Sequence, residues 1–426
     1  MKKKLLQNFV ASAGSTFWAT LLQLGSAPIL LSIWGLSGYG EWILLSTIPA
    51  YLSLSDAGLT ASATADMTKA YVKGEKRRVY EVYQGMTHMI RWMGAALGAA
   101  TLVIGLLLAT DASRHLVLAG AILVAYTWLT IWTRMQLSLF RSIDRFATST
   151  IVYDAVQFFE GASVLVIAKL GGGYVGAALG LLVGRSVIFL YQAVGVRTYL
   201  ADQLSSRLSA GQNWQEVKRL MPNALNALSI PAAFALSSQG IVLILGAAVG
   251  SSAAAIFSTV RTAARVSLQL VGIINRATIP MFASSSAAGD TRRAQQIVWL
   301  NLAVIGLVLA PMNALFAFYG DVLIRFWTHK EMVIDHRLFA LFALAIVINA
   351  VWNFSANLLV YKGEGDGLGV RLMLSASGAM LICLVGVRYG GLASAGIASV
   401  MYEVLALIFL SRKAWMLLHL DARAGK

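Results

Sequence analysis

Apolar stretches of about 20 residues, the length that crosses the hydrocarbon core of a bilayer as a helix, recur along the whole chain. Of its 426 residues, 58% are hydrophobic and 12% are charged, whereas soluble globular proteins carry about 25% charged residues. The sequence therefore predicts an all-α polytopic membrane protein. The twelve predicted spans cover residues 8–34, 42–64, 83–108, 114–140, 148–168, 173–196, 221–246, 252–282, 294–319, 336–361, 367–388 and 390–411.

Several kinds of site are excluded by what the sequence lacks. Its one cysteine, Cys383, allows neither an intramolecular disulfide nor a cysteine-based metal cluster. The five histidines form no His-x-x-x-His pair, and there is no nucleotide-binding motif. The basic start MKKK is not followed by a small-residue cleavage site, so we expect no cleavable signal peptide. We also expect no metal, no cofactor and no catalytic residue, and transport that this chain does not drive with ATP.

Lys and Arg residues are distributed unevenly between the two sides that these spans define. The side with both termini carries 21 of them, and the opposite side carries 5. Because positively charged connections stay in the cytoplasm, both termini are expected there. The net charge of +15 is then mostly a signature of orientation, and nucleic-acid binding is not needed to explain it.

The two halves of the chain look like copies of one unit. The longest cytoplasmic connection, residues 197–220, separates six predicted spans from six. KGEKRR (73–78) and AGDTRR (288–293) each follow the second span of a half with a Gly-acid turn and two arginines. An even number of spans gives both halves the same orientation, and such parallel repeats are a transporter architecture. We expect an N-terminal six-helix bundle with its linker in 1–210 and a C-terminal six-helix bundle in 211–426.

Two motifs resemble those of a known family. LSLSDAGLTASATADMTKAYVKGE (52–75), with Asp-x-Gly-Leu deep in a span and a Gly-acid turn after it, is similar to the second helix of bacterial polysaccharide repeat-unit flippases. IPMFASSSAAGD (279–290) is similar to the Pro and Gly-Asp ending of their eighth helix. These flippases belong to the MATE-like multidrug/oligosaccharidyl-lipid/polysaccharide superfamily, which this chain resembles in length, span count and repeat.

The resemblance implies two six-helix bundles around a central cavity that opens alternately to the two sides of the bacterial inner membrane. It implies that the substrate is an undecaprenyl-diphosphate-linked oligosaccharide, a repeat unit of O-antigen lipopolysaccharide or exopolysaccharide. This substrate would move from the cytoplasmic to the periplasmic leaflet, coupled to a proton or sodium gradient. A complex with a polysaccharide polymerase is left open, and we expect a monomer.

Three arginines lie in one predicted span, 252–282, where each would cost at least about 2.5–3.5 kcal/mol without a partner or water. At 100° per residue, Arg261, Arg265 and Arg276 fall within an arc of about 60°, and Gln269 lies about 20° beyond it. The other predicted spans of the second half contain one acid, Glu403. An excess of positive charge favours an anionic ligand, and guanidinium groups offer the paired donors that suit a diphosphate.

Three roles are open for this arginine stripe, formed by Arg261, Arg265 and Arg276. It can contact the substrate or its headgroup. It can pair with Asp56 of the second span across a closed gate. It can also be purely structural.

Depth in the membrane suggests partners for the charges of the first half. Arg134 and Asp154 lie at similar depth in neighbouring spans, and so do Glu160 and Arg185. We expect two intramembrane ion pairs from these four residues. The residues assigned to gating or ion coupling are Asp56, Asp154, Glu160, Arg185 and Glu403, and the sequence does not choose a carrier among them.

Other polar and aromatic residues fit a sugar. Asn349, Asn353 and Asn357 recur every four residues with Trp352 beside them. Their amides can bind hydroxyls and the indole can stack on a pyranose, while amide bonding between helices is an equal alternative. Trp18 in the first span is a further candidate. Arg91, with His88 one turn before it, either lines the cavity or reaches the membrane interface.

Two other functions compete with the flippase. A multidrug or organic-ion antiporter of the same superfamily would need more acids than arginines in its spans to attract a cation, which is the opposite of what the sequence has. A membrane glycosyltransferase, polymerase or ligase would need acids or histidines in a sizeable external loop. The longest external loop, residues 320–335, is short, so we do not expect an enzyme.

Overall fold

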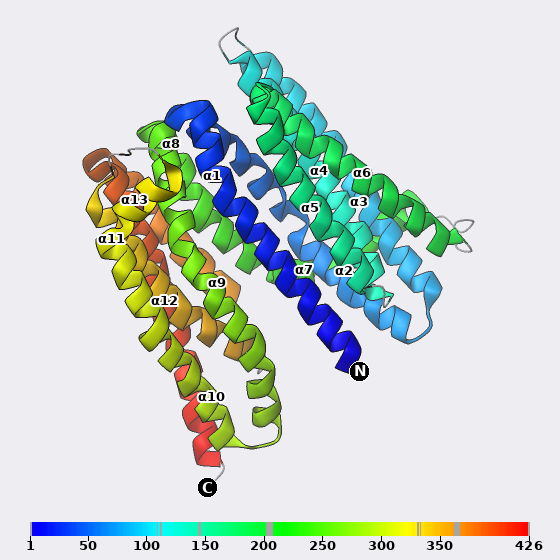
Figure 1. The fold of residues 1–426 in the computed structure, drawn as a ribbon. Coiled ribbons are helices and arrows are strands. Elements are labelled where there is room, and N and C mark those ends of the chain that lie inside the picture. Colours follow the sequence, from blue (N-terminus) through cyan, green and yellow to red (C-terminus); the bar gives the residue numbers. More distant parts are fainter. Residues whose placement is uncertain are drawn as a thin grey trace. The chain divides into compact units, whose positions relative to one another are not determined.

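The computed structural model describes residues 2–108, 110, 113–143, 146–201, 208–329, 332, 334–361 and 367–424. The side chains of 2–19, of 411–424 and of scattered positions that include Asp154 and Arg276 lie outside this description. The described chain is helical almost throughout and has no strand (Figure 1). The helices are α1 (Lys2–Leu52), α2 (Leu54–Val72), α3 (Lys76–Leu108), α4 (Arg114–Ser142), α5 (Phe146–Lys169), α6 (Gly173–Tyr199), α7 (Ala210–Ala235), α8 (Ile241–Ala248), α9 (Ser251–Ala287), α10 (Thr291–Val304), α11 (Ala310–Thr328), α12 (His336–Tyr361) and α13 (Leu368–Ala424), with π-helices η2 (Leu236–Gly240) and η3 (Ile305–Leu309).

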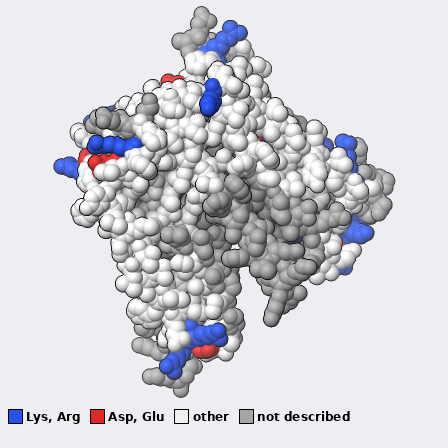
Figure 2. Space-filling model, viewed as in Figure 1, with Lys and Arg blue, Asp and Glu red and all other residues white. Residues whose placement is uncertain are grey.

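Eight helical segments of the described chain are long and apolar enough to cross a membrane. On the face drawn in Figure 2, charged side chains form separate groups and leave wide areas without charge between them. The prediction of an all-α, multi-pass membrane protein is therefore confirmed. The helix α9, which carries the arginine stripe, is not among the eight segments, because its polar residues lower its hydropathy.

Two long helices are each interrupted at a single glycine. Gly35 (φ 68°) interrupts α1 between the first two predicted spans, and Gly391 (φ 49°) interrupts α13 at the second residue of the last predicted span. Both lie in the left-handed region that glycine adopts without a steric penalty. Figure 1 shows α1 turning back at its end remote from the N-terminus. In α1, one glycine therefore replaces the connection predicted at residues 35–41.

The turns in KGEKRR and AGDTRR have the same backbone. Gly74 and Gly289 both have positive φ, 77° and 74°. The amide after each glycine bonds back five residues at 2.9 Å, Glu75 N to Ala70 O and Asp290 N to Ser285 O. This bond and the left-handed glycine define a Schellman helix end. The match found in the sequence therefore corresponds to a repeated structural element.

The helices form two compact units. Unit 1 is Met1–Ile33 with Leu44–Pro231, and unit 2 is Trp34–Ile43 with Ala232–Lys426. The expected division at 210/211 lies at the start of α7, whereas the two units divide within α7. An added Cβ on Gly58 of α2 would lie 1.9 Å from the carbonyl oxygen of Ala224, so these two helices are in direct contact. Leu220 and Ala224 also belong to the buried core of unit 1.

Ionic contacts hold the first half of α7 in unit 1. Arg78 of α3 donates to Glu216 of α7 through Nη1 at 2.8 Å, and also to Glu81 at 3.1 Å. Arg219, one turn after Glu216, pairs with Asp66 of α2. The Arg78 guanidinium holds the pKa of Glu216 below its ordinary value, chiefly through this hydrogen bond. One ionic network therefore joins α7 to α2 and α3, which lie far before it in the sequence.

A second ion pair lies inside unit 1. Arg185 of α6 donates to Glu160 of α5 at 2.6 Å, and their side chains are only 1% and 3% exposed. Tyr126 of α4 donates to the same carboxylate at 3.2 Å, and the guanidinium lies 5.4 Å from its ring centroid. The predicted Glu160–Arg185 pair is confirmed. This buried pair joins α5 to α6, and the hydrogen bond from Tyr126 adds α4.

We expect the Glu216 network to make stability depend on acid pH. A lowered pKa in the folded state means that the contribution is present above the ordinary Glu value and is lost as pH falls through the folded value. Glu216→Gln should lower stability at neutral pH by about 1 kcal/mol or less, because the pair is partly exposed. Thermal unfolding of the detergent-solubilised protein between neutral and acid pH measures this, with Glu75→Gln as the control. A wild-type pH profile for Glu216→Gln would contradict the expectation.

We expect the Glu160–Arg185 pair to behave as one unit. Arg185→Met leaves a buried carboxylate without its partner, which costs about 3–5 kcal/mol. The double variant Glu160→Gln/Arg185→Met should recover most of this loss, since neither charge remains. A double-mutant cycle in unfolding free energy tests the pair, and additive single effects would show that the two residues are not coupled.

Candidate functional site

The described part of the arginine stripe lies in a small polar cavity of unit 2. The cavity has a volume of about 40 Å³, which has room for a single water molecule. Arg261 and Arg265 come from α9, one turn apart, and Glu403 comes from α13. The remaining lining residues are Ser237, Ser238, Phe342, Ala345, Ile346, Ser399 and Tyr402. Two cations and one carboxylate therefore share this cavity.

Two donors of α12 fix the carboxylate of Glu403. Asn349 donates its amide to Glu403 Oε2 at 2.9 Å, and the indole N–H of Trp352 donates to the same oxygen. The charge of Arg265 acts on this carboxylate as well. Charge-assisted hydrogen bonds of this kind are the stronger ones in proteins. The carboxylate of Glu403 therefore receives its hydrogen bonds from α12 and also lies in the field of Arg265 on α9.

A π-helix supplies the partner of Arg261. Its guanidinium donates to the carbonyl oxygen of Ser238, within η2, and lies 5.4 Å from the ring centroid of Phe257. Tyr39 of the segment Trp34–Ile43 is close enough for its hydroxyl to interact with Arg261, and it shares a hydrogen bond with Thr259. Single π-helical turns are often found at functional sites. The first arginine of the stripe is therefore partly satisfied by the protein backbone.

The asparagine and tryptophan candidates have structural partners in this conformation. Trp352 is 1% exposed, and its ring stacks on Phe234 with centroids 6.1 Å apart. It therefore offers no free face to a pyranose. The amide of Asn349 bonds between α12 and α13, which is the interhelical alternative, while Asn357 donates to Asn353 Oδ1 at 3.1 Å within α12.

The structure places Arg134 beside an acid that was not predicted as its partner. Its Nη1 lies 3.7 Å from the carboxylate of Asp56, which is fully buried, and Thr60 donates to that carboxylate at 2.9 Å. Depth in the membrane does not show whether Arg134 of α4 pairs with Asp56 of α2 or with Asp154 of α5, because both helices pack beside α4. The partner predicted for Arg134 was Asp154, whose side chain is outside the described residues. Asp56 thus has a cation within unit 1.

Two more of the predicted site residues fall on side chains that the structure does not describe. They are Arg276, the third arginine of the stripe, and Trp18. Gln269 lies on α9 two turns after Arg261. The described residues that come together in unit 2 are therefore Arg261, Arg265, Glu403, Asn349 and Trp352.

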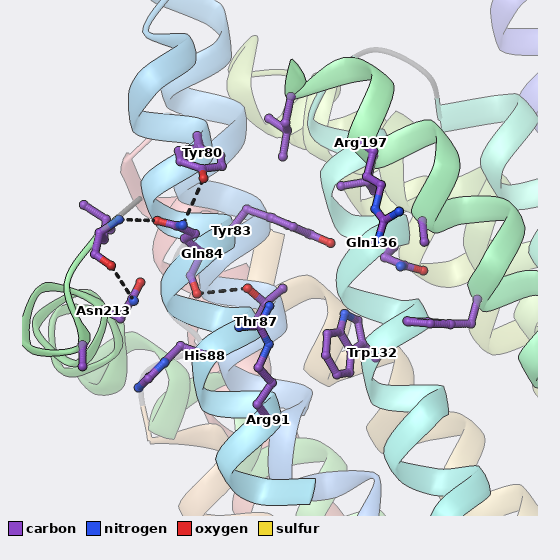
Figure 3. Close-up of a pocket in the computed structure, with 16 residues that line it drawn as sticks. Tyr80, Tyr83, Gln84, Thr87, His88, Arg91, Trp132, Gln136, Arg197 and Asn213 are labelled. Atoms are coloured by element: carbon purple, nitrogen blue, oxygen red, sulfur yellow. Dashed lines mark hydrogen bonds between the residues drawn. The ribbon is translucent and has the colours of Figure 1, made fainter. Parts of the chain in front are cut away.

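Arg91 lines a larger cavity, in unit 1, that sequence reasoning missed (Figure 3). The cavity has a volume of about 540 Å³ and lies among α3, α4, α6 and the start of α7. Arg91 is exposed, and its guanidinium lies 5.9 Å from the ring centroid of Trp132. A polar stripe at helical spacing along α3, namely Tyr80, Gln84, Thr87, His88 and Arg91, was the signal that could have revealed it.

Comparisons with known proteins agree on the architecture. Neither a family model nor a curated relative matches the sequence. An inward-facing multidrug resistance MATE family transporter of the MOP superfamily has a TM-score of 0.73 at 15% identity, over 96% of each chain. A MOP superfamily transporter from Pyrococcus furiosus, described as having a binding pocket of reverse polarity, has a TM-score of 0.53 at 15% identity, over 95% of this chain and 96% of its own. The chain therefore has the fold of the MATE transporters of the MOP superfamily, with twelve membrane helices in two bundles.

Proposed function

We propose that the protein is an alternating-access transporter that moves an undecaprenyl-diphosphate-linked oligosaccharide from the cytoplasmic to the periplasmic leaflet. The observation that carries this proposal is the cavity of unit 2, where Arg261 and Arg265 face a single carboxylate. Glu403 can neutralise one of the two guanidinium groups, so the site keeps an excess of positive charge. An anionic headgroup supplies the missing charge.

The chemistry of the two arginines favours a phosphate over other anions. Guanidinium groups present planar, paired donors that match phosphate oxygens. Arg261 already donates to the Ser238 carbonyl, so Arg265 is the residue with more donors to offer. The cavity of about 40 Å³ is too small for a headgroup, and the proposal therefore requires that the site opens during transport.

The distribution of charge supports the orientation of the transporter. The excess of Lys and Arg on one side, 21 against 5, favours cytoplasmic termini in a bacterial inner membrane. Among the acids considered for ion coupling, Glu403 is the one that shares a cavity with the arginine stripe. We infer that Glu403 is the residue through which an ion gradient would act on substrate binding.

A multidrug or organic-ion antiporter is the second candidate function. Glu403 favours it, because a carboxylate held in a membrane helix can exchange a proton for a cation. The two arginines beside this carboxylate oppose it, because they repel a cationic drug. The sign of the charge that the site attracts therefore distinguishes the two functions.

We expect Arg265→Ala to weaken binding of undecaprenyl diphosphate at least tenfold, or about 1.4 kcal/mol. Arg265→Lys should retain part of the affinity if charge alone matters, and little of it if paired donors matter. Binding to the purified protein in phosphatidylcholine nanodiscs measures this. Arg337→Ala, at the exposed start of α12, is the control. Wild-type affinity in Arg265→Ala would overturn the proposal.

We expect Glu403→Gln to act in opposite directions for the two functions. Removal of the carboxylate leaves both arginines without their acid, so undecaprenyl diphosphate should bind severalfold more tightly. An organic cation such as ethidium should lose binding or proton-driven efflux in the same variant. Tighter cation binding together with weaker diphosphate binding would show that the assignment of charges is wrong.

A further inference from the structure

The cavity in unit 1 has the polarity of a binding site, and the proposed transport function does not use it. Its 16 lining residues in the described part of the chain include two arginines, Arg91 and Arg197, and no Asp or Glu among them. Its volume of about 540 Å³ is within the range of small-molecule sites, about 300–1,000 Å³. A cavity with two cations and no acid in its lining favours an anion.

The arginines approach the cavity from different helices. Figure 3 shows Tyr83 of α3 pointing toward Gln136 of α4 and Arg197 of α6. Arg91 lies farther along α3, near Trp132. Arg91 and Arg197 are both exposed, so a ligand can reach them from outside the helices. In Figure 3, Arg197 lies beside Gln136, whereas Arg91 lies at the other end of the cavity. An anionic group bound by Arg197 would therefore be close to the amide of Gln136.

Two amide oxygens deeper in the lining have no hydrogen-bond partner among the described atoms. They are Oε1 of Gln136, whose residue is 2% exposed, and Oδ1 of Asn213, whose residue is 7% exposed. A buried acceptor without a donor costs about 1–3 kcal/mol. Both residues line the cavity, and Figure 3 shows them on opposite sides of α3. A hydroxyl group bound beside Arg197 could therefore donate to Gln136.

The rest of the lining gives the cavity fixed walls. Gln84 donates to Tyr80 at 3.0 Å and accepts from the backbone N–H of Leu208 at 2.9 Å, which ties α3 to the segment before α7. Thr87 donates to the Gln84 carbonyl at 3.0 Å. The aromatic rings of Tyr83 and Trp132 form further parts of the cavity wall. Donors for an anion, acceptors for hydroxyls and aromatic faces for a carbon skeleton are therefore present together.

We propose that this cavity binds a phosphate group that carries a hydroxylated head, such as a glycerol phosphate or sugar phosphate. The guanidinium group of Arg197 binds the phosphate, and the amide oxygen of Gln136 beside it accepts from a hydroxyl. Such a group belongs either to the headgroup of an anionic membrane lipid or to a free phosphate ester. This site is distinct from the arginine stripe and is independent of what the transporter moves.

The test measures binding to the full-length protein in phosphatidylcholine nanodiscs. One arm adds phosphatidylglycerol to the bilayer, and the other adds free glycerol 3-phosphate. Ligand-induced thermal stabilisation is the readout, because a ligand that binds the folded state raises its stability. We expect stabilisation in at least one arm, and the arm identifies the source. Stabilisation in neither arm overturns the proposal.

Paired variants locate the binding. Arg91→Gln/Arg197→Gln should weaken binding at least tenfold, whereas Arg114→Gln/Lys169→Gln removes the same charge from exposed positions outside the cavity and should bind as the wild type does. The unfolding curve without ligand identifies a variant that fails to fold. Equal affinity in the two double variants contradicts the proposal.

Gln136→Leu tests the role of the hydroxyls separately. This change removes one acceptor and leaves both guanidinium groups, so glycerol 3-phosphate should lose severalfold more affinity than inorganic phosphate does. An equal loss for both probes would show that the amide does not recognise hydroxyls.

Discussion

The cost of an ionised side chain in hydrocarbon is the constraint on which the rest of this structure depends. Each charge inside a helix needs a partner, and the partners lie on other helices. Glu160 and Arg185 bond to each other at 2.6 Å, and Arg134 approaches the buried Asp56. In unit 2, Glu403 takes its bonds from α12. Since these contacts are few and directional, they select which helices are neighbours in a way that apolar packing alone does not.

The helix α7 runs from unit 1 into unit 2 and leads to a place where the chain can bend. Its first half is held in unit 1 by Arg78 and Glu216, and the chain passes into unit 2 after Pro231. Five residues later η2 begins, and its Ser238 carbonyl accepts from Arg261. A π-helix interrupts the regular ladder and is a place where a helix can change its bend. The segment that links the two units is therefore also the segment that holds the first arginine of the stripe.

The sequence predicted the helices well because hydrophobic length and periodicity are local properties. The Glu160–Arg185 pair was also predictable, since two opposite charges at equal depth in consecutive helices leave few alternatives. The contact of Arg134 with Asp56 was not predicted, because both α2 and α5 pack beside α4 and depth does not choose between their acids. The cavity around Arg91 was missed for a related reason: Gln136, Arg197 and Asn213 come from three other segments, and only tertiary packing brings them together. The role of Trp352 depends on Glu403, which lies 51 residues away in sequence.

The polarity of the unit 2 cavity also limits how transport of an anion could be driven. With Glu403 ionised, the two arginines leave a net charge of about +1, and protonation raises it to about +2. A proton and an anion therefore favour each other's binding, by the reciprocity of linked equilibria. That coupling would carry a proton outward with the proposed substrate, against an inward proton gradient. An inside-negative membrane potential acts the other way, since each negative charge moved fully outward gains about 2.3 kcal/mol per 100 mV. For a diphosphate with more than one charge, this electrical gain exceeds the electrical cost of moving one proton outward. In the proposed transport, the membrane potential would therefore act in favour of export.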